Sequence, residues 1–555
     1  MTRWPARLAL AAAVLVTLTA APHVRPTSRT SLPRLSVIVE GASAEAARLA
    51  VTEVGGTVTH DLRVIDAVGA AVTPGQAEAL RRRPGLTLRQ NYGVRTAAAS
   101  VVPALEQATY DNARVHSDQV TARAVSGRGV TVAVLDTGVS LFDEINRSPY
   151  TSQRILMNYD AIQNREGGSW QDNDGNGHGT HIASIVASSY ATGPYGDQRV
   201  TGTFQTDSRY HGIAPGANLV VVKAFDQSGA GTYADVIRGL DWIVSNRARF
   251  NIRVLNLSFS APPRSHYWED PLNRAVMRAW QAGIVVVVSA GNRGPNPMSV
   301  GVPGNVPYVI TVGAMTDHYT PANASDDYLA SFSSVGPTHE GFVKPEVVAP
   351  GGHVMATMSV SDAIAQQHPS FYNGTYGNFY QMSGTSQATA VVSGVVALML
   401  ERQPGLTPDQ VKYRLMAGSR PAVLPTGKLA YSVFQQGAGQ VDAYRAVFGA
   451  VSGTANRGLD LAADLAGTKH FRGRANRVNG KFVIDGLTAD GYAWTGSYLW
   501  SDGYLWSDSY LWSDSYLWSD SYLWSDSSFW ATSFLWSDSF LWSDSVATNA
   551  WVDEQ

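Results

Sequence analysis

Residues 383–394 read Ser-Gly-Thr-Ser-Gln-Ala-Thr-Ala-Val-Val-Ser-Gly, and the chain stays dense in Ala and Val for two further turns. This pattern predicts a long helix over residues 386–401 that begins at Ser386. Unpaired N–H groups and the positive end of the helix dipole would then lie beside the serine hydroxyl. Gly384 omits a Cβ where a second backbone has to approach. Small residues at the start of a helix can also be explained by packing alone. The function of Ser386 therefore has to be inferred together with the residues that would act with it.

Two other short segments contain the partners that a nucleophilic serine needs. Val-Ala-Val-Leu-Asp-Thr-Gly (132–138) places Asp136 at the end of an apolar run, and Gly-Asn-Gly-His-Gly-Thr-His (175–181) contains His178. A hydroxyl is a poor nucleophile until a base takes its proton and a carboxylate orients that base. We therefore predict Asp136, His178 and Ser386 as acid, base and nucleophile.

The chain order Asp, His, Ser is the order of subtilisins, and these three motifs make residues 125–450 resemble a subtilisin-like serine peptidase (family S8). The resemblance implies a serine endopeptidase that hydrolyses peptide bonds through an acyl-enzyme. It implies that His178 is the base, whereas His181 is a packed residue of the same helix. It also implies an oxyanion hole made by Asn292, at the end of Val-Val-Val-Val-Ser-Ala-Gly-Asn, and the N–H of Ser386.

Substrate recognition follows from the same resemblance. Leu-Asn-Leu-Ser-Phe-Ser (255–260) occupies the place of a strand that pairs with an extended substrate through main-chain hydrogen bonds. The residues expected to bind substrate are Ser258, Phe259, Ser260, Ala290 and Gly291. Ser260 stands where the family pattern has glycine, and its Cβ narrows the primary specificity pocket if the resemblance holds. The cleavage preference is therefore left open.

Composition sets the general class. A chain of 555 residues predicts two or three domains, and 44% hydrophobic with 16% charged residues is ordinary for a globular protein. The net charge of −3 gives no reason to expect nucleic acid or an anionic membrane as partner. The chain has no cysteine, so its stability has to come from core burial or bound ions rather than disulfides.

The first residues have the pattern of an export signal. Arg3 and Arg7 precede the apolar residues 8–18, and Thr-Ala-Ala follows, which predicts a cleaved signal peptide over residues 1–21. A retained anchor is the alternative, but the run is shorter than the roughly 20 residues that span a bilayer. We expect no transmembrane segment and a secreted, extracellular or cell-surface protein.

Residues 34–95 predict a small α+β domain. Strands are expected at 35–40, 57–64, 67–72 and 86–91, and helices at 44–54 and 74–83. The position and pattern of this ferredoxin-like unit resemble the inhibitory propeptide of subtilisins. The resemblance implies a self-inhibited precursor whose own propeptide is an intramolecular inhibitor, with the mature chain starting between about 93 and 120. An unrelated N-terminal domain is the alternative.

Residues 110–450 alternate short apolar runs with helical stretches. Runs rich in β-branched residues lie at 130–135, 219–224, 254–257, 284–288 and 309–312, with helical segments at 178–187, 234–244 and 272–282. Apolar runs without alternation are typical of strands buried on both faces. The pattern predicts an α/β fold with a doubly wound parallel sheet and helices on both faces. Asp136 and Asn292 follow two of these strands, at the edge where such sheets bind ligands.

The C-terminal part has a different composition. A Gly/Ala/Arg-rich connector is expected over residues 451–497, and a hexapeptide repeat, Tyr/Phe-Leu-Trp-Ser-Asp-Ser, fills residues 498–545. Its even period places the aromatic residues and Asp on one face of a strand. Surface attachment, a glycan- or protein-binding platform, or a low-complexity tail without fixed structure all fit. The alternative function is a cell-surface binding protein that acts through this tail, with proteolysis limited to self-processing.

One motif suggests a metal and is set aside. Asp-Asn-Asp-Gly-Asn-Gly (172–177) matches the opening of an EF-hand loop, but Ala183 stands where the loop needs its bidentate glutamate. We predict a polar turn that leads into the catalytic helix. No cofactor is expected for catalysis, and the resemblance allows structural calcium whose ligands are unknown.

Overall fold

The computed structural model describes residues 34–96, 110–148, 150–168, 172–191, 198–199, 212–320, 323–373, 378–425, 429–478 and 481–484. The expected signal peptide (1–21) and repeat tail (498–545) lie outside these residues. Within the described ranges, none of the helices combines the length and the hydropathy that a bilayer crossing requires.

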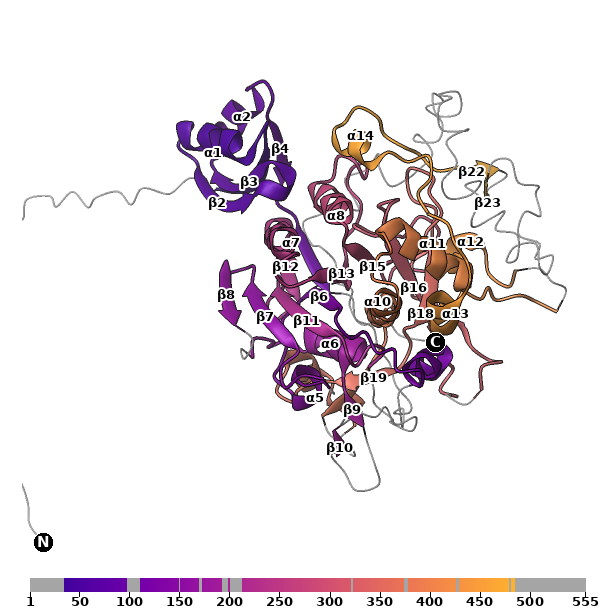
Figure 1. The fold of residues 1–555 in the computed structure, drawn as a ribbon. Coiled ribbons are helices and arrows are strands. Elements are labelled where there is room, and N and C mark those ends of the chain that lie inside the picture. Colours follow the sequence, from indigo (N-terminus) through magenta and orange to yellow (C-terminus); the bar gives the residue numbers. More distant parts are fainter. Residues whose placement is uncertain are drawn as a thin grey trace, which may run out of the picture.

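A nine-stranded sheet forms the centre of the molecule (Figure 1). Its strands follow the order β17-β16-β15-β13-β6-β11-β7-β8, and β18 also pairs with β16. The parallel strands are β6 (Thr131–Asp136), β7 (Ile155–Asp160), β11 (Asn218–Lys223), β13 (Ile252–Leu257), β15 (Val285–Ser289), β16 (Ile310–Thr316) and β18 (Val347–Pro350). Two short antiparallel strands, β8 (Arg165–Gly168) and β17 (Tyr328–Leu329), close the edges.

Burial explains why the central strands lack alternation. Every residue of β6, β15, β16 and β18 is buried, so both faces of these strands need apolar side chains. The helices α6 (His178–Ala187) and α10 (Thr385–Arg402) pack against each other and on the sheet, whereas α7 (Tyr233–Asn246) and α8 (Pro271–Gln281) form a second packed pair (Figure 1). The predicted doubly wound parallel sheet with helices on both faces is confirmed.

Shorter elements surround this core. The helices are α3 (Asp111–Arg114), α4 (Ser117–Thr121), α5 (Asp143–Asn146), α9 (Ala363–Gln367), α11 (Pro408–Gly418), α12 (Val433–Gln436) and α13 (Ala443–Phe448), with a 3-10 turn at Pro369–Phe371. The strands are β9 (Tyr190–Ala191), β10 (Gln198–Arg199), β19 (Val354–Thr357), β20 (Tyr372–Asn373) and β21 (Phe379–Met382). The last of these helices, α13, begins at Ala443, where the side chain of Asp442 caps its first turn.

The N-terminal residues form a separate α+β unit with its own cluster of buried side chains. Its elements are β1 (Leu35–Glu40), α1 (Ala44–Glu53), β2 (Thr57–Leu62), a 3-10 turn (Arg63–Ile65), β3 (Ala67–Val72), α2 (Pro74–Arg81) and β4 (Thr87–Gln90). The antiparallel sheet order β2-β3-β1-β4 is the ferredoxin-like βαββαβ arrangement.

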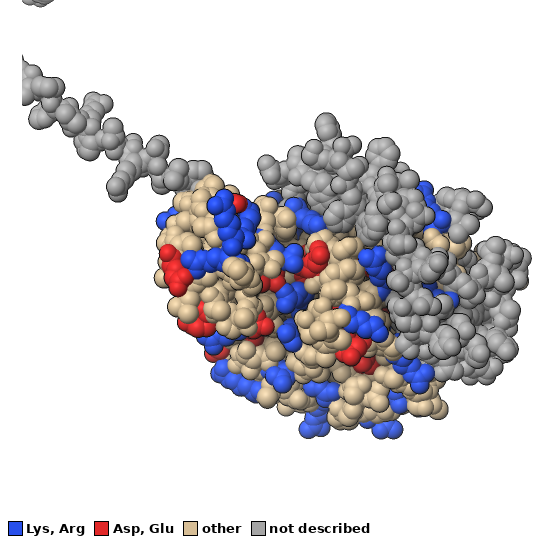
Figure 2. All heavy atoms as spheres, turned by 90° about the horizontal axis from the view of Figure 1, so that it is seen from above, with Lys and Arg blue, Asp and Glu red and all other residues tan. Residues whose placement is uncertain are grey.

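This N-terminal unit docks on α7 and α8 of the body. His60 Nε2 lies 3.1 Å from Asp235 Oδ1, and Arg238 donates from Nη2 to the backbone oxygen of Thr59 at 3.0 Å. Acidic and basic side chains both lie over the unit and the adjoining body (Figure 2). The contact is therefore polar at several points, as is common between domains of one chain.

A short strand that the sequence did not indicate joins the two parts. β5 (Gly93–Thr96) lies between β12 (Ala230–Thr232) and β14 (Phe259–Ser260), and it pairs antiparallel with both. Thr96 also donates its N–H to the backbone oxygen of Gly229 at 3.1 Å. The N-terminal unit therefore extends its own chain into the body as the middle strand of a three-stranded sheet.

The segment expected as a plain connector, residues 451–497, is folded in its described part. It contains α14 (Leu461–Leu465) and the hairpin β22 (Ala475–Val478) and β23 (Lys481–Ile484). Asp464 accepts hydrogen bonds from the buried hydroxyl groups of Tyr267 at 2.6 Å and Tyr308 at 2.9 Å. This described part of the expected connector therefore belongs to the body, because its acidic and apolar side chains complete the core.

Candidate active site

Asp136 and His178 form a buried pair. Asp136 ends β6, and its Oδ1 lies 2.7 Å from His178 Nδ1, while both side chains are 0% exposed. The same oxygen accepts the N–H of Thr137 at 2.8 Å. A carboxylate bound to Nδ1 holds the proton on that nitrogen and directs Nε2 to the opposite side of the ring. The two residues are thus arranged as an acid that orients a base.

The turn before His178 is built around one buried carboxylate, that of Asp174. Oδ1 accepts hydrogen bonds at 2.9–3.0 Å, and Oδ2 accepts two more at 2.6–2.9 Å. The donors are the N–H groups of Asn176, Gly177 and Thr180 and the hydroxyl groups of Thr137 and Thr180. The sequence predicted a polar turn here but gave no role to Asp174.

Ser386 lies in the first turn of α10 and is tied to the end of β13. Its Oγ donates to the backbone oxygen of Ser258 at 2.9 Å, and Ser258 Oγ donates to the backbone oxygen of Ser386 at 2.9 Å. Asn256 fixes both elements, because its Nδ2 donates to Ser258 Oγ and its Oδ1 accepts from Ser393 Oγ of the same helix. Since α10 also packs against α6, the fold brings the helix that begins at His178 against the helix of Ser386.

The amide of Asn292 has a fixed orientation. Its Oδ1 accepts both the N–H of Thr385 at 3.0 Å and the hydroxyl of Thr385 at 2.7 Å. An oxygen that accepts two hydrogen bonds leaves Nδ2 as the donor on the other side. Nδ2 is buried and has no partner among the described residues. Asn292 therefore presents an unused buried donor beside the residue that precedes Ser386.

The predicted substrate-binding residues lie around the same point. Phe259 and Ser260 form β14, whose backbone pairs with Thr96 and Arg95 of β5. The Phe259 ring itself is fully buried and packs on Phe225 at 5.2 Å, so only its backbone faces an extended chain. Ala290 and Gly291 precede Asn292 in the sequence, and the Gly291 N–H donates to Thr385 Oγ1 at 3.2 Å.

The second histidine of the motif is a packed residue. His181 is fully buried, and its Nε2 donates to the backbone oxygen of Tyr380 at 2.9 Å. Burial lowers the pKa of His181 to about 3, with the nearby His178 adding to this effect. His181 therefore stays neutral in this environment.

Metal ligands are not grouped in the described part of the chain. There, no three His, Asp or Glu side chains come together in an arrangement that holds a metal ion. Asp174 of the EF-hand-like segment uses both carboxylate oxygens for hydrogen bonds within the turn, and Asn173 Oδ1 accepts the N–H of Val139. These side chains fit a turn and not a calcium loop.

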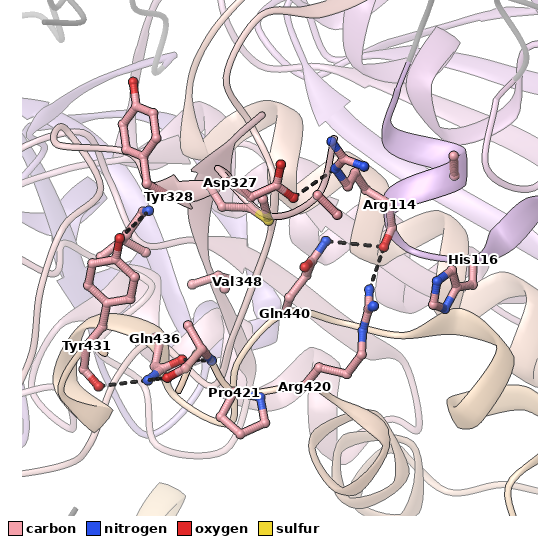
Figure 3. Close-up of a pocket in the computed structure, with 15 residues that line it drawn as sticks. Arg114, His116, Asp327, Tyr328, Val348, Arg420, Pro421, Tyr431, Gln436 and Gln440 are labelled. Carbon is pink, nitrogen blue, oxygen red and sulfur yellow. Dashed lines mark hydrogen bonds and ion pairs between the residues drawn. The ribbon is translucent and has the colours of Figure 1, made fainter. Parts of the chain in front are cut away.

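A cavity of about 270 Å³ contains none of the predicted site residues. In it, Arg114 pairs with Asp327 at 2.8 Å, and the side chains of Arg420 and Gln440 donate to the backbone oxygen of Arg114 (Figure 3). The charged side chains that line this cavity thus already have partners within the protein. We do not assign the predicted chemistry to this cavity.

Comparison with known proteins identifies the family. The model of the subtilase family (peptidase S8) matches residues 127–439, which contain Asp136, His178, Asn292 and Ser386. The chain belongs to the subtilase family of serine-type endopeptidases, whose members need no cofactor for catalysis.

Named relatives agree with this family. The chain is 39% identical to serine protease AprX of Bacillus subtilis over 311 residues, covering 55% of this chain and 64% of AprX. It is 31% identical to subtilisin DY of Bacillus licheniformis, covering 54% of this chain and 87% of that protein. The fold resembles that of fervidolysin from Fervidobacterium pennivorans, with a TM-score of 0.57 and 21% identity over 76% of this chain and 62% of that one. The chain thus spans somewhat less than two thirds of AprX and of fervidolysin.

Proposed function

We propose that this protein is a secreted serine endopeptidase, made as a precursor that its own N-terminal domain inhibits. The observation that carries the catalytic part is the buried 2.7 Å contact between Asp136 and His178, on a helix that packs against the helix with Ser386 in its first turn. Family membership supports peptides and proteins as substrates. The signal-like residues 1–21 support export to the extracellular space or the cell surface.

The mechanism follows from these groups. His178 Nε2 takes the proton of Ser386 Oγ as the oxygen attacks the peptide carbonyl, and Asp136 stabilises the resulting imidazolium. The carbonyl oxygen becomes an oxyanion that accepts hydrogen bonds from Asn292 Nδ2 and the Ser386 N–H. His178 then gives its proton to the leaving amine. Water hydrolyses the acyl-enzyme by the same proton transfers in reverse.

Proton transfer requires the hydroxyl hydrogen of Ser386 to point at His178 Nε2. Ser386 Oγ lies 2.9 Å from the Ser258 backbone oxygen, which is a second acceptor for the same hydrogen. A rotation about χ1 moves Oγ without moving the helix, because Ser386 remains anchored through its backbone oxygen to Ser258 Oγ.

The precursor part of the proposal rests on β5. An extended substrate binds such an enzyme as an added strand, and β5 already fills the position between β12 and β14. The N-terminal domain therefore excludes substrate from the cleft that its own chain occupies. The boundaries 34–95 for this domain and 110–450 for the peptidase domain are part of the same proposal.

The test is activity-based labelling of the purified, processed protein. A fluorophosphonate should label wild-type protein at Ser386, and the protein should hydrolyse casein. Ser386→Ala should abolish labelling and lower kcat about 10⁶-fold, a loss known from subtilisin itself. Full casein hydrolysis by the Ser386→Ala variant would contradict the assignment of the nucleophile.

A further inference from the structure

We infer that Ser260 restricts the residue before the cleaved bond to small side chains such as alanine. This inference rests on the proposed function, because it concerns the substrate of the same site. The feature that prompts it is the Ser260 hydroxyl, which is buried and has no hydrogen-bond partner in the described part of the chain. A buried hydroxyl without a partner is uncommon in a folded protein.

The strand register places the cleaved bond relative to Ser260. Thr96 of β5 pairs with Phe259, and Arg95 pairs with Ser260. Because the strands are antiparallel, the next residue of an extended chain stands opposite Ser258. The Ser258 backbone oxygen is the one that accepts Ser386 Oγ at 2.9 Å. A chain in this register therefore presents the carbonyl of the residue after Thr96 to the nucleophile.

Three backbone segments meet beside this position. The N–H of Gly301 donates to the oxygen of Ala290 at 3.1 Å, and the N–H of Ala261 donates to the oxygen of Val302 at 2.9 Å. These bonds join the segment after β14, the segment before Asn292 and residues 301–302. The residue before the cleaved bond lies opposite Ser258, and these segments adjoin Ser258. The side chain of that residue therefore has to lie along them.

Ser260 occupies the space between two of the segments. A methyl group added at Gly291 would lie 2.8 Å from Ser260 Oγ, and one added at Gly301 would lie closer still. The side chain of Ser260 thus fills the space that is left because Gly291 and Gly301 have no side chains. A large side chain in this space would overlap with Ser260, and overpacking of this kind is destabilising. An alanine methyl group needs far less of that space.

The sequence of the chain agrees with a small residue at this point. Gly-Val-Arg-Thr of β5 continues as Ala-Ala-Ala over residues 97–99, which lie outside the described part. The residue that follows Thr96 in the sequence is therefore an alanine. The contacts of Ser260 and the chain's own sequence after β5 thus both indicate a small side chain before the cleaved bond.

The test compares two matched substrates on the processed protein. Succinyl-Val-Arg-Thr-Ala-p-nitroanilide and succinyl-Val-Arg-Thr-Phe-p-nitroanilide differ only in the residue before the cleaved bond. We expect kcat/KM to be at least about tenfold higher for the alanine substrate, a ratio within the range that pocket size produces. A preference of the wild-type protein for phenylalanine would overturn the inference.

Variants of Ser260 distinguish the effect of its Cβ on specificity from the effect of its hydroxyl. Ser260→Gly should shift the ratio toward phenylalanine by about tenfold or more, and Ser260→Ala should keep the preference for alanine because the Cβ remains. Ser265→Gly, five residues further on, is the matched control and should leave the ratio unchanged. An unchanged ratio in Ser260→Gly would also overturn the inference.

Labelling distinguishes the two levels of the proposal. If a fluorophosphonate labels Ser386 and the phenylalanine substrate is preferred, only the specificity inference fails. If the processed protein is neither labelled nor cleaves either substrate, the proposed function fails and the inference fails with it.

Discussion

Thr180 donates two hydrogen bonds to Asp174, one from its backbone N–H at 2.9 Å and one from its hydroxyl at 2.6 Å. Thr137, the residue after Asp136, donates its hydroxyl to the other oxygen of the same carboxylate at 2.9 Å. One buried acid thus connects the strand end that holds Asp136 to the helix that begins at His178. We therefore expect Asp174 to be a positioning residue, because its hydrogen bonds go to these neighbours of Asp136 and His178.

Asp174→Asn should lower kcat about 100-fold while KM changes only severalfold, because small displacements of a catalytic base have effects of this size. The amide that replaces one oxygen cannot accept the hydrogen bonds made there. Steady-state kinetics on the alanine substrate measures this split. Asp172→Asn, at an exposed position of the same turn, is the control. An equal fall in the control, or an unchanged kcat in Asp174→Asn, would refute the positioning role.

Asn292→Ala should remove the oxyanion donor. Loss of this kind of donor in subtilisin lowers kcat by about 10²–10³, and we expect a loss in that range with little change in KM. The Thr385 N–H and hydroxyl also lose their acceptor. Asn292→Asp restores an acceptor for Thr385 without the Nδ2 donor, so it should be as inactive as Asn292→Ala. Recovery of activity in Asn292→Asp would contradict the donor role.

The register of β5 predicts the first processing step. The bond after Ala97 should be cut, so the mature chain should begin at Ala98, as N-terminal sequencing and intact mass would show. The Ser386→Ala precursor should remain uncut. Thr96→Pro removes the N–H that donates to Gly229 and should weaken the fit of β5. A mature chain that begins far from residue 98 in both wild-type and Thr96→Pro protein would refute this register.

Stability should depend on pH through Asp362. Burial, followed by the negative charge of Asp174, raises the pKa of Asp362 to about 7. In the unfolded chain this carboxyl loses its proton near pH 4. Between these values the folded state binds more protons, so the free energy of unfolding falls as the pH rises. Asp362→Asn should reduce the fall in Tm between pH 5 and pH 8.

Calorimetry in a Ser386→Ala background measures this effect without self-digestion. Glu45→Gln, whose side chain is 72% exposed, is the control and should behave as the parent protein. If Asp362→Asn keeps the full pH dependence of the parent, Asp362 does not carry it.

Asp464→Ala should destabilise the body although the residue lies beyond the family match. The change leaves the buried hydroxyl groups of Tyr267 and Tyr308 without their acceptor, and each such loss costs about 1–3 kcal/mol. Urea unfolding of the Ser386→Ala protein measures the difference. Glu269→Ala, at an exposed position near Tyr267, should have a small effect. Equal free energies of unfolding for both variants would mean that the segment containing Asp464 does not stabilise the body.

The central sheet could be predicted because its strands are buried on both faces. The run expected at 130–135 is β6 (Thr131–Asp136), and the run at 254–257 lies within β13 (Ile252–Leu257). In such strands burial alone dictates apolar residues, so the pattern survives in the sequence. The pairing of Asp136 with His178 could be anticipated too, because both belong to short motifs whose order along the chain is characteristic.

Features that depend on distant partners could not be predicted. Gly-Val-Arg-Thr of β5 contains one apolar aliphatic residue and becomes a strand only because residues 230–232 and 259–260 flank it. Asp174 resembles any turn residue until its donors are known. Asp464 lies in a stretch rich in Gly, Ala and Arg, and its burial depends on tyrosines about 160 and 200 positions earlier.

If the proposed cut after Ala97 takes place, the pairing of β5 on both edges makes cleavage and release of the N-terminal domain two separate events. After the bond is cut, the N-terminal fragment is still held by hydrogen bonds to β12 and β14 and by its contacts with α7 and α8. The interval between the two events would delay the opening of the cleft to substrate. During this interval the N-terminal fragment would keep substrates out of the cleft although the bond is already cut.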